Sequence, residues 1–398
     1  MVNRRRRRKP ARRGSVPGGS WHVSDVSEPV AQPVEHLTFN QGVSGSNPDG
    51  LTIFFGAATL GPPPAVPVEL DGERALLIVY LMTRLARHTV RPSLPYFPDD
   101  LRRSIRVLTY GAALKMRALP VATYIFSDVE RLGPQAQKLA ARIWTALERS
   151  GRPVRLINHP IRAMRRPELL RNLFERGIND FNAYPALQPP IQMRFPVFLR
   201  GASDHDGPRS DLIYDRTTLD AEIAKLEAAG LSRQDCLIVE FCDTRDGNGI
   251  FRKHDAFLAD GKILPTDVYF SSNWVVKWES NRVFNGHVPT TASLAREEVE
   301  YISSDRYCEQ LRQAVAPTHI GYGRIDYALL GDRVQIWEIN TNPDLWLAPM
   351  DVPERLATPY ARDVFPQVKA AIFSAFRSLD TVADEDAPIP VDLSVPIA

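Results

Sequence analysis

The chain has 398 residues, 44% of them hydrophobic and 24% charged, so it can bury two or three cores. A formal net charge of +2 is too small to indicate a nucleic-acid or membrane partner for the whole protein. The three cysteines form no CxxC pair, which argues against a disulfide framework or a zinc site and predicts a reducing, cytoplasmic location. The longest apolar run, residues 75–82, is too short to span a bilayer.

Residues 1–50 are rich in Arg, Pro, Gly and Ser, and this composition predicts disorder. The run Arg4 to Arg8 is typical of a nuclear signal or an RNA-binding arm. We favour a different hypothesis, that this segment is a translated lysine-tRNA gene, because residues 30–36 can be encoded as a D stem, 37–41 as an anticodon arm and 45–48 as the T-arm consensus. The true start codon would then lie downstream, and deletion of residues 1–50 would leave stability unchanged.

The chain beyond residue 50 contains alternating strand and helix patterns. Residues 51–104 receive no assignment, whereas 105–185 predict a small α/β domain with strands at 105–110, 121–126 and 154–157 and a helix at 135–150. Further on, the patterns predict helices at 219–229, 297–314 and 359–379, and strands at 239–241, 257–264 and 268–270. An acidic, Pro-rich tail at 381–398 is expected to be disordered.

A predicted hairpin near the C-terminus carries the most informative polar residues. Its strands contain Gly323 to Ala328 and Glu338 to Pro343, and Gly331-Asp332 supplies a tight turn. Alternation places Asp326, Glu338 and Asn340 on one face, while Ile325, Tyr327, Trp337 and Ile339 pack on the other. Hard oxygen ligands of this kind suit Mg²⁺ bridged to phosphates. The alternative is an amphipathic hairpin with a solvated polar face.

This spacing, with Arg324 two residues before the first acid, resembles the C-terminal motif of the ATP-grasp superfamily. The likeness is strongest to carboxylate–amine ligases such as D-alanine–D-alanine ligase and glutathione synthetase-like enzymes. The resemblance implies that Asp326, Glu338 and Asn340 hold two Mg²⁺ ions, with Mn²⁺ as the alternative. It also implies that Arg324 contacts the phosphate being transferred.

Three further segments resemble the family in the order that the family requires. Asn158-His159-Pro160 precedes Arg166, which stands where the family has a phosphate-contacting lysine. Phe195 to Arg200 is similar to the strand that ends in the second nucleotide lysine, and the small, polar residues 201–207 suit a flexible lid. Leu237 to Asp243 resembles the hinge strand, which implies that Glu240 contacts adenine and that Asp243 or Asp246 contacts the ribose.

Each of these assignments has a structural alternative. Arg166 and Arg200 could be ordinary surface arginines, Glu240 a strand-end carboxylate, and Arg324 a partner of Asp326 alone.

The chain also departs from the family. Both lysines are replaced by arginine, which grips phosphate as a fork where lysine is a movable point charge. Asp344 stands where the ligases usually have glycine, and Asp255 where the superfamily often has arginine. Either Arg252 or Lys253 could supply the charge missing at that position.

The resemblance implies an α/β ATP-grasp fold in which two α+β subdomains, at 186–270 and 271–380, grip the nucleotide behind the domain at 105–185. It implies an ATP-dependent ligase that forms an acyl phosphate and joins it to an amine or a thiol. The expected partners are small-molecule carboxylates and amines, not nucleic acid or membrane, with a homodimer as an alternative to a monomer. The competing hypotheses are an ATP-binding regulatory or scaffold module without ligase activity, and an RNA-binding protein.

Overall fold

The computed structural model of the protein describes residues 77–84, 89–276, 288, 291–345, 347, 360–379 and 388–390. The predictions for residues 1–50, including the Arg4 to Arg8 run, and those for most of the tail at 381–398, lie outside this range. Among the described residues, no helix has the length and apolarity needed to cross a bilayer.

Four parallel strands form the first sheet, in the spatial order β2-β1-β4-β5. These strands are β1 (Ile78–Met82), β2 (Ile105–Thr109), β4 (Thr123–Phe126) and β5 (Arg155–Ile157). Side chains of β1 alternate between two core clusters, Val79 and Leu81 in one and Ile78, Tyr80 and Met82 in the other. Residues of helix α3 (Pro134–Arg149) pack in the first cluster, and residues of α10 (Phe365–Ser378) in the second.

The strand β1 lies inside residues 51–104, where the sequence patterns gave no assignment. All five of its residues are buried, which explains the miss, because a strand covered on both faces is a continuous apolar run without alternation. The α/β layer predicted at 105–185 therefore includes a central strand that lies before residue 105. The other domain boundaries stay predictions.

Two antiparallel sheets follow along the chain. One has the order β6-β8-β7, and the other the order β10-β9-β11-β12. Their strands are β6 (Ala183–Pro185), β7 (Val197–Gly201), β8 (Cys236–Glu240), β9 (Phe251–Ala259), β10 (Lys262–Ser271), β11 (Tyr322–Leu330) and β12 (Arg333–Asn340). A short pair, β3 (Ala118–Leu119) with β13 (Ile389–Pro390), completes the described strands.

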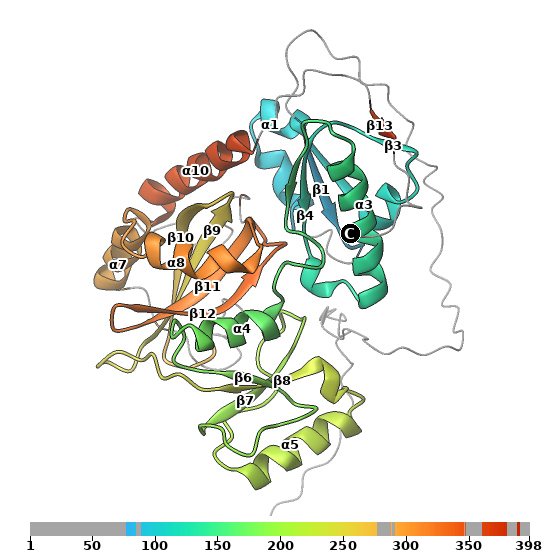
Figure 1. The fold of residues 1–398 in the computed structure, drawn as a ribbon. Coiled ribbons are helices and arrows are strands. Elements are labelled where there is room, and N and C mark those ends of the chain that lie inside the picture. The colour runs from blue at the N-terminus through green and yellow to red at the C-terminus, as the bar shows by residue number, and fades with distance from the viewer. Residues whose placement is uncertain are drawn as a thin grey trace, which may run out of the picture. The chain divides into compact units, whose positions relative to one another are not determined.

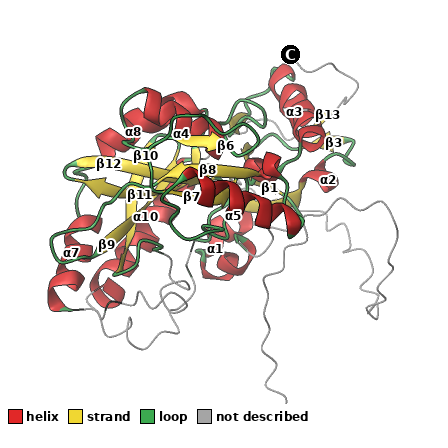
Figure 2. Cartoon of the chain, turned by 90° about the horizontal axis from the view of Figure 1, so that it is seen from below, coloured by secondary structure: helices red, strands yellow, loops and turns green. Residues whose placement is uncertain are grey.

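The remaining helices pack on these sheets, and Figures 1 and 2 show their places. Helix α4 (Arg166–Glu175) contacts both β6 and β12, while α7 (Ala292–Ile302), α8 (Cys308–Val315) and α10 contact β10. Helix α5 (Arg216–Ala228) packs in one core cluster with residues of β7 and β8. The others are α1 (Asp99–Ser104), α2 (Tyr110–Ala113), the 3₁₀ turns Arg91–Tyr96, Val129–Arg131, Arg233–Asp235 and Ala316–Thr318, and the π turn Tyr360–Val364.

The predicted α/β fold class is confirmed, with parallel and antiparallel sheets in one chain, but two predicted elements are wrong. The strand predicted at 257–264 is interrupted by the β9–β10 turn at Asp260-Gly261, where both residues have positive φ. An Asp-Gly pair favours this kind of two-residue hairpin turn. The helix predicted at 297–314 is two helices, α7 and α8, because residues 303–307 between them are not helical.

Candidate functional site

The β11–β12 hairpin has the register that the sequence predicts. Asp326 lies opposite Glu338 and Arg324 opposite Asn340, so all four side chains share one face of the sheet. Gly331, with φ +61°, and Asp332 form the turn between the two strands. The local sequence therefore brings two acids, an amide and an arginine together.

One expectation for this hairpin is wrong. Trp337 was predicted to pack on the face opposite Glu338, but the register shifts after Asp326, and Tyr327 lies opposite Ile336. Trp337 is the extra residue of this bulge, and it turns toward the polar face, where it lines the cavity described next. Its ring stacks on Phe181 at 4.4 Å between centroids.

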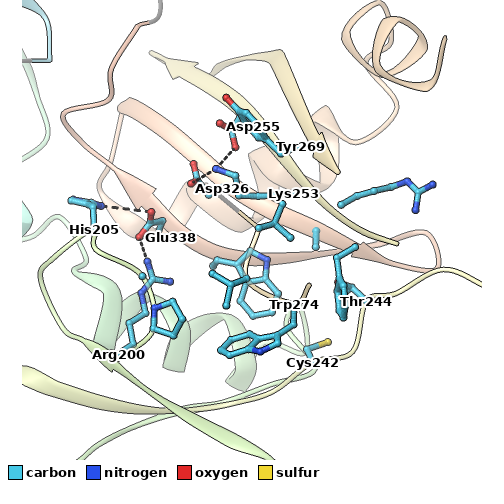
Figure 3. A pocket seen from close by; sticks show the side chains of 18 of the residues that line it. Arg200, His205, Cys242, Thr244, Lys253, Asp255, Tyr269, Trp274, Asp326 and Glu338 are labelled. Carbon is cyan, nitrogen blue, oxygen red and sulfur yellow. Dashed lines mark hydrogen bonds and ion pairs between the residues drawn. The ribbon is translucent and has the colours of Figure 1, made fainter. Parts of the chain in front are cut away.

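A cavity of about 450 Å³ lies over this face of the sheet (Figure 3). This volume is within the range of small-molecule sites. Its charged and amide lining comes from Arg200, His205, Arg252, Lys253, Asp255, Arg324, Asp326, Glu338, Asn340 and Asp344. Its apolar and aromatic lining comes mainly from Phe198, Phe241, Cys242, Phe251, Trp274, Val275, Val276 and Trp337. One cavity thus offers stacking surfaces for a planar ring and charges for an ionic group.

Asp326 is held by two cations. Arg324 Nε lies 2.8 Å from its carboxylate, and Lys253 Nζ lies 3.0 Å from it. A second buried acid, Asp255 on β9, lies opposite Asp326 and contacts the same ammonium at 3.0 Å. Burial alone would raise the pKa of Asp326, but Arg324 and then Lys253 lower it. For Asp255, burial and the Asp326 charge raise the pKa to about 6.

Glu338 is held by three basic side chains. Arg200 Nη2 donates to Glu338 Oε2 at 2.6 Å, Arg166 donates to the same oxygen, and His205 Nδ1 lies 3.6 Å from the other oxygen. The Glu338 side chain is only 10% exposed. Burial would raise the pKa of Glu338, yet Arg200 and Arg166 hold it well below its usual range. For His205, burial would lower the pKa, but Glu338 and Glu130 raise it.

The lid predicted at 201–207 is tied to the site by the same residues. Arg166 donates to the carbonyl oxygens of Gly201 and Asp204, each at 2.7 Å. His205 Nε2 lies 3.2 Å from Glu130, which follows strand β4 of the parallel sheet. Glu130 also accepts from the hydroxyl of Thr341, the residue directly after β12. Three elements distant in sequence thus meet at Glu338.

The donor chemistry of this face fits Mg²⁺. Asp326 and Glu338 are deprotonated acids, and Asn340 adds an amide oxygen that accepts from the Asn342 backbone at 2.9 Å. Within the described part of the chain, no three Asp, Glu, His or Cys side chains already surround one metal position. Both acids are paired with cations, so an incoming metal ion has to compete with these cations.

Three residues implied by the resemblance do not line the cavity. Arg166 is buried and contacts the cavity residue Glu338. Glu240 is buried and accepts from the backbone amides of Asn182 and Arg194 and from the Tyr184 hydroxyl. Asp243 pairs with Arg245 at 2.5 Å, and both side chains are more than two-fifths exposed. Phe241, Cys242 and Thr244, from the same segment, line the cavity instead. The adenine and ribose roles of Glu240 and Asp243 stay predictions, and the contacts of Glu240 agree with the strand-end alternative.

The structure distinguishes between Arg252 and Lys253. Arg252 binds Asp246 at 2.8 Å and also Glu297, whereas Lys253 contacts the two acids of the site. The sequence patterns did not identify His205, Glu130, Trp274 or Asp255 as site residues. Of these, only Asp255 had a local signal, because it shares a strand face with Lys253.

Comparisons with known proteins complete the description of the site. No protein-family model and no curated protein matches the chain. Among solved structures it is similar to D-alanine–D-alanine ligase from Bacillus anthracis complexed with ATP, at 13% identity and TM-score 0.43, over 77% of this chain and 96% of that one. It is similar to an L-amino acid ligase from Bacillus licheniformis, at 11% identity and TM-score 0.36, over 68% of each chain. A third is N5-carboxyaminoimidazole synthase from Aspergillus clavatus with ADP, at 13% identity and TM-score 0.40, over 68% and 70%.

All three TM-scores are below 0.5, so the chemistry of the site is argued from the side chains described above.

Proposed function

We propose that the protein is an ATP-grasp enzyme that uses Mg-ATP to activate a carboxylate and join it to an amine or a thiol. The observation that carries this proposal is the single cavity that combines an aromatic lining with Asp326, Glu338, Asn340 and the cations Arg200 and Arg324. A nucleotide needs both surfaces, since its base is planar and apolar and its phosphates are highly charged. An amphipathic hairpin with a merely solvated polar face does not account for acids that are buried under a cavity.

Different side chains of the site would bind different parts of Mg-ATP. Trp274, Phe241 and the segment after β8 would enclose the base, and Arg200 and Arg166 would grip the phosphates as forks. Asp326, Glu338 and Asn340 would hold Mg²⁺, which neutralises charge on the β- and γ-phosphates when it is bound.

The proposed reaction has two steps. A carboxylate oxygen of the substrate attacks the terminal phosphorus, ADP leaves, and an acyl phosphate forms. An amine or thiol then attacks the acyl carbon, and inorganic phosphate leaves. Arg324 lies beside Asp326 and would stabilise the negative charge on the phosphoryl group during the transfer. The substrates are expected to be small carboxylates and amines.

One observation favours a second candidate, an ATP-binding module without ligase activity. Arg166 and Arg200 both replace lysines of the family, and both are bound to Glu338 rather than directed away from it. If both arginines stay paired with Glu338 when nucleotide binds, the metal cannot reach Glu338. The protein would then bind ATP without turning it over.

The first experiment is a thermal shift with ATP, with and without Mg²⁺. A ligand that binds only the native state raises the apparent stability, and a shift is expected only when both are present. No shift at millimolar Mg-ATP would refute both candidates.

The second experiment traps the acyl phosphate as a hydroxamate across a panel of amino acids and peptides. Hydroxamate that depends on ATP supports the ligase. Binding of Mg-ATP without hydroxamate, and without ADP release in the presence of any panel member, supports the module.

A further inference from the structure

Lys253 is the lysine that lines the cavity among the residues that the structure describes. It lies near the start of β9, and Tyr269 on β10 is its neighbour in the register. Its ammonium is 3.0 Å from Asp326, 3.0 Å from Asp255 and 4.8 Å from the centre of the Tyr269 ring. Figure 3 shows the side chain directed toward the two acids. The side chain is 16% exposed.

The two acids beside Lys253 determine where its ammonium lies when a metal ion binds. Asp255 is 1% exposed, so water does not solvate its carboxylate, and the charged form needs cations beside it; Lys253 at 3.0 Å and Arg324 at 3.4 Å supply them. Asp326 already has Arg324 as a second partner at 2.8 Å. If Asp326 binds a metal ion, the ammonium of Lys253 loses this contact and is repelled by the metal, while Asp255 continues to hold it at the cavity surface.

The cations of the site also differ in their freedom. Arg166 is fixed by the carbonyl oxygens of Gly201 and Asp204 as well as by Glu338, and Arg200 donates to Glu338. An ammonium on a four-carbon stem, by contrast, can turn between neighbouring oxygens. A phosphate chain that enters this cavity with a metal ion would supply oxygens next to Asp326. When the metal ion displaces the Lys253 ammonium from Asp326, the ammonium is therefore already beside the phosphates.

We propose that Lys253 binds the phosphate chain of the nucleotide, and that Asp255 positions it. This inference rests on the proposed function, and it adds a third phosphate-binding cation to Arg166 and Arg200. In the structure, Lys253 pairs with Asp326. With Mg-ATP bound, it moves to a phosphate oxygen while remaining paired with Asp255. The competing explanation is a purely structural role, in which Lys253 only ties β9 to β11.

The test compares the affinities of ATP, ADP, AMP and adenosine, each with Mg²⁺, for the wild-type protein, Lys253→Met, Lys253→Arg and Lys225→Met. Lys225 is the matched control, because its side chain is 74% exposed on helix α5. We expect Lys253→Met to weaken ATP about tenfold or more and to leave adenosine unchanged, since one charge-assisted hydrogen bond to phosphate is lost. Lys253→Arg should recover part of the ATP affinity, and Lys225→Met should match the wild type.

Two outcomes would overturn the inference. Equal weakening of ATP and adenosine by Lys253→Met would show a structural role, as would unchanged ATP affinity in a folded variant. Circular dichroism and the denaturation midpoint of each variant separate these results from loss of the fold. If the wild-type protein itself binds no nucleotide, the proposed function fails, and that result is distinct from failure of the Lys253 assignment. Asp255→Asn should weaken ATP in the same direction as Lys253→Met and leave adenosine unchanged.

Discussion

Replacement of Glu338 by Gln removes one charge from a cluster in which three basic side chains contact a single carboxylate. The substitution keeps the size of the side chain but removes the negative charge that Arg166, Arg200 and His205 share. Arg166 is 5% exposed and Arg200 is 13% exposed, so neither can turn fully into water. Breaking a buried pair by removing one partner costs about 3–5 kcal/mol, because the remaining charge is left without compensation. We expect a loss in the lower part of this range, since Arg166 keeps its bonds to the carbonyl oxygens of Gly201 and Asp204.

Urea denaturation measures this loss. Glu338→Gln should lower the midpoint while the slope with denaturant stays the same, which indicates a change in stability without a change in the unfolded surface. Glu309→Gln is the matched control, because Glu309 pairs with an arginine but is 64% exposed, and its loss should cost about 0.5 kcal/mol or less. Adding ATP without metal should restore part of the lost stability, since phosphates replace the missing carboxylate. A Glu338→Gln protein as stable as the wild type would show that Glu338 does not balance the arginines.

Three further predictions concern single side chains. Arg200→Ala should weaken ATP at least tenfold more than adenosine, and Arg200→Lys should restore part of the difference, as titration calorimetry can measure. Burial and then Arg252 lower the pKa of His254 to about 3, from an ordinary 6.5. Below pH 6.5 the unfolded chain binds a proton that the native protein does not, so stability should fall toward pH 3 by at most about 1.4 kcal/mol per pH unit, and denaturation of His254→Phe should show a shallower fall. Mg-ATP should change the tryptophan fluorescence, and Trp274→Phe should reduce that change while Trp144→Phe, a substitution on helix α3, should not.

The sequence predicts those features that depend on neighbouring residues. Asp326, Glu338 and Asn340 could be placed on one face because strand alternation and the Gly331-Asp332 turn are local. The position of Trp337 could not, because a one-residue bulge reverses the alternation and leaves no mark in the composition. The strand β1 was missed for the related reason that a strand buried on both faces has no alternation to detect.

Local sequence patterns do not predict contacts between segments that are distant in the chain. His205 meets Glu130 and Glu338 only because the segment after β7, the end of β4 and the end of β12 converge. A lone histidine in a small, polar loop gives no sign of these partners in the sequence. The assignment of Glu240 to adenine stays a prediction, and it shows what a motif cannot reveal, namely that the oxygens of this acid already accept from backbone amides.

The pairing of acids with cations also determines how metal and nucleotide should bind. Glu338 and Asp326 can take Mg²⁺ only if Arg200 and Lys253 leave them, and these cations can take phosphate only if they leave the acids. Each ligand therefore removes the obstacle to the other, which is a positive coupling between two binding events. Couplings of this kind are about 1–3 kcal/mol and reciprocal, so Mg²⁺ should tighten ATP by the same factor by which ATP tightens Mg²⁺. Because Glu338→Gln has no carboxylate for Arg200 to leave, ATP affinity in that variant should depend much less on Mg²⁺. An unchanged dependence would place the metal on phosphate alone and remove Glu338 from the set of ligands.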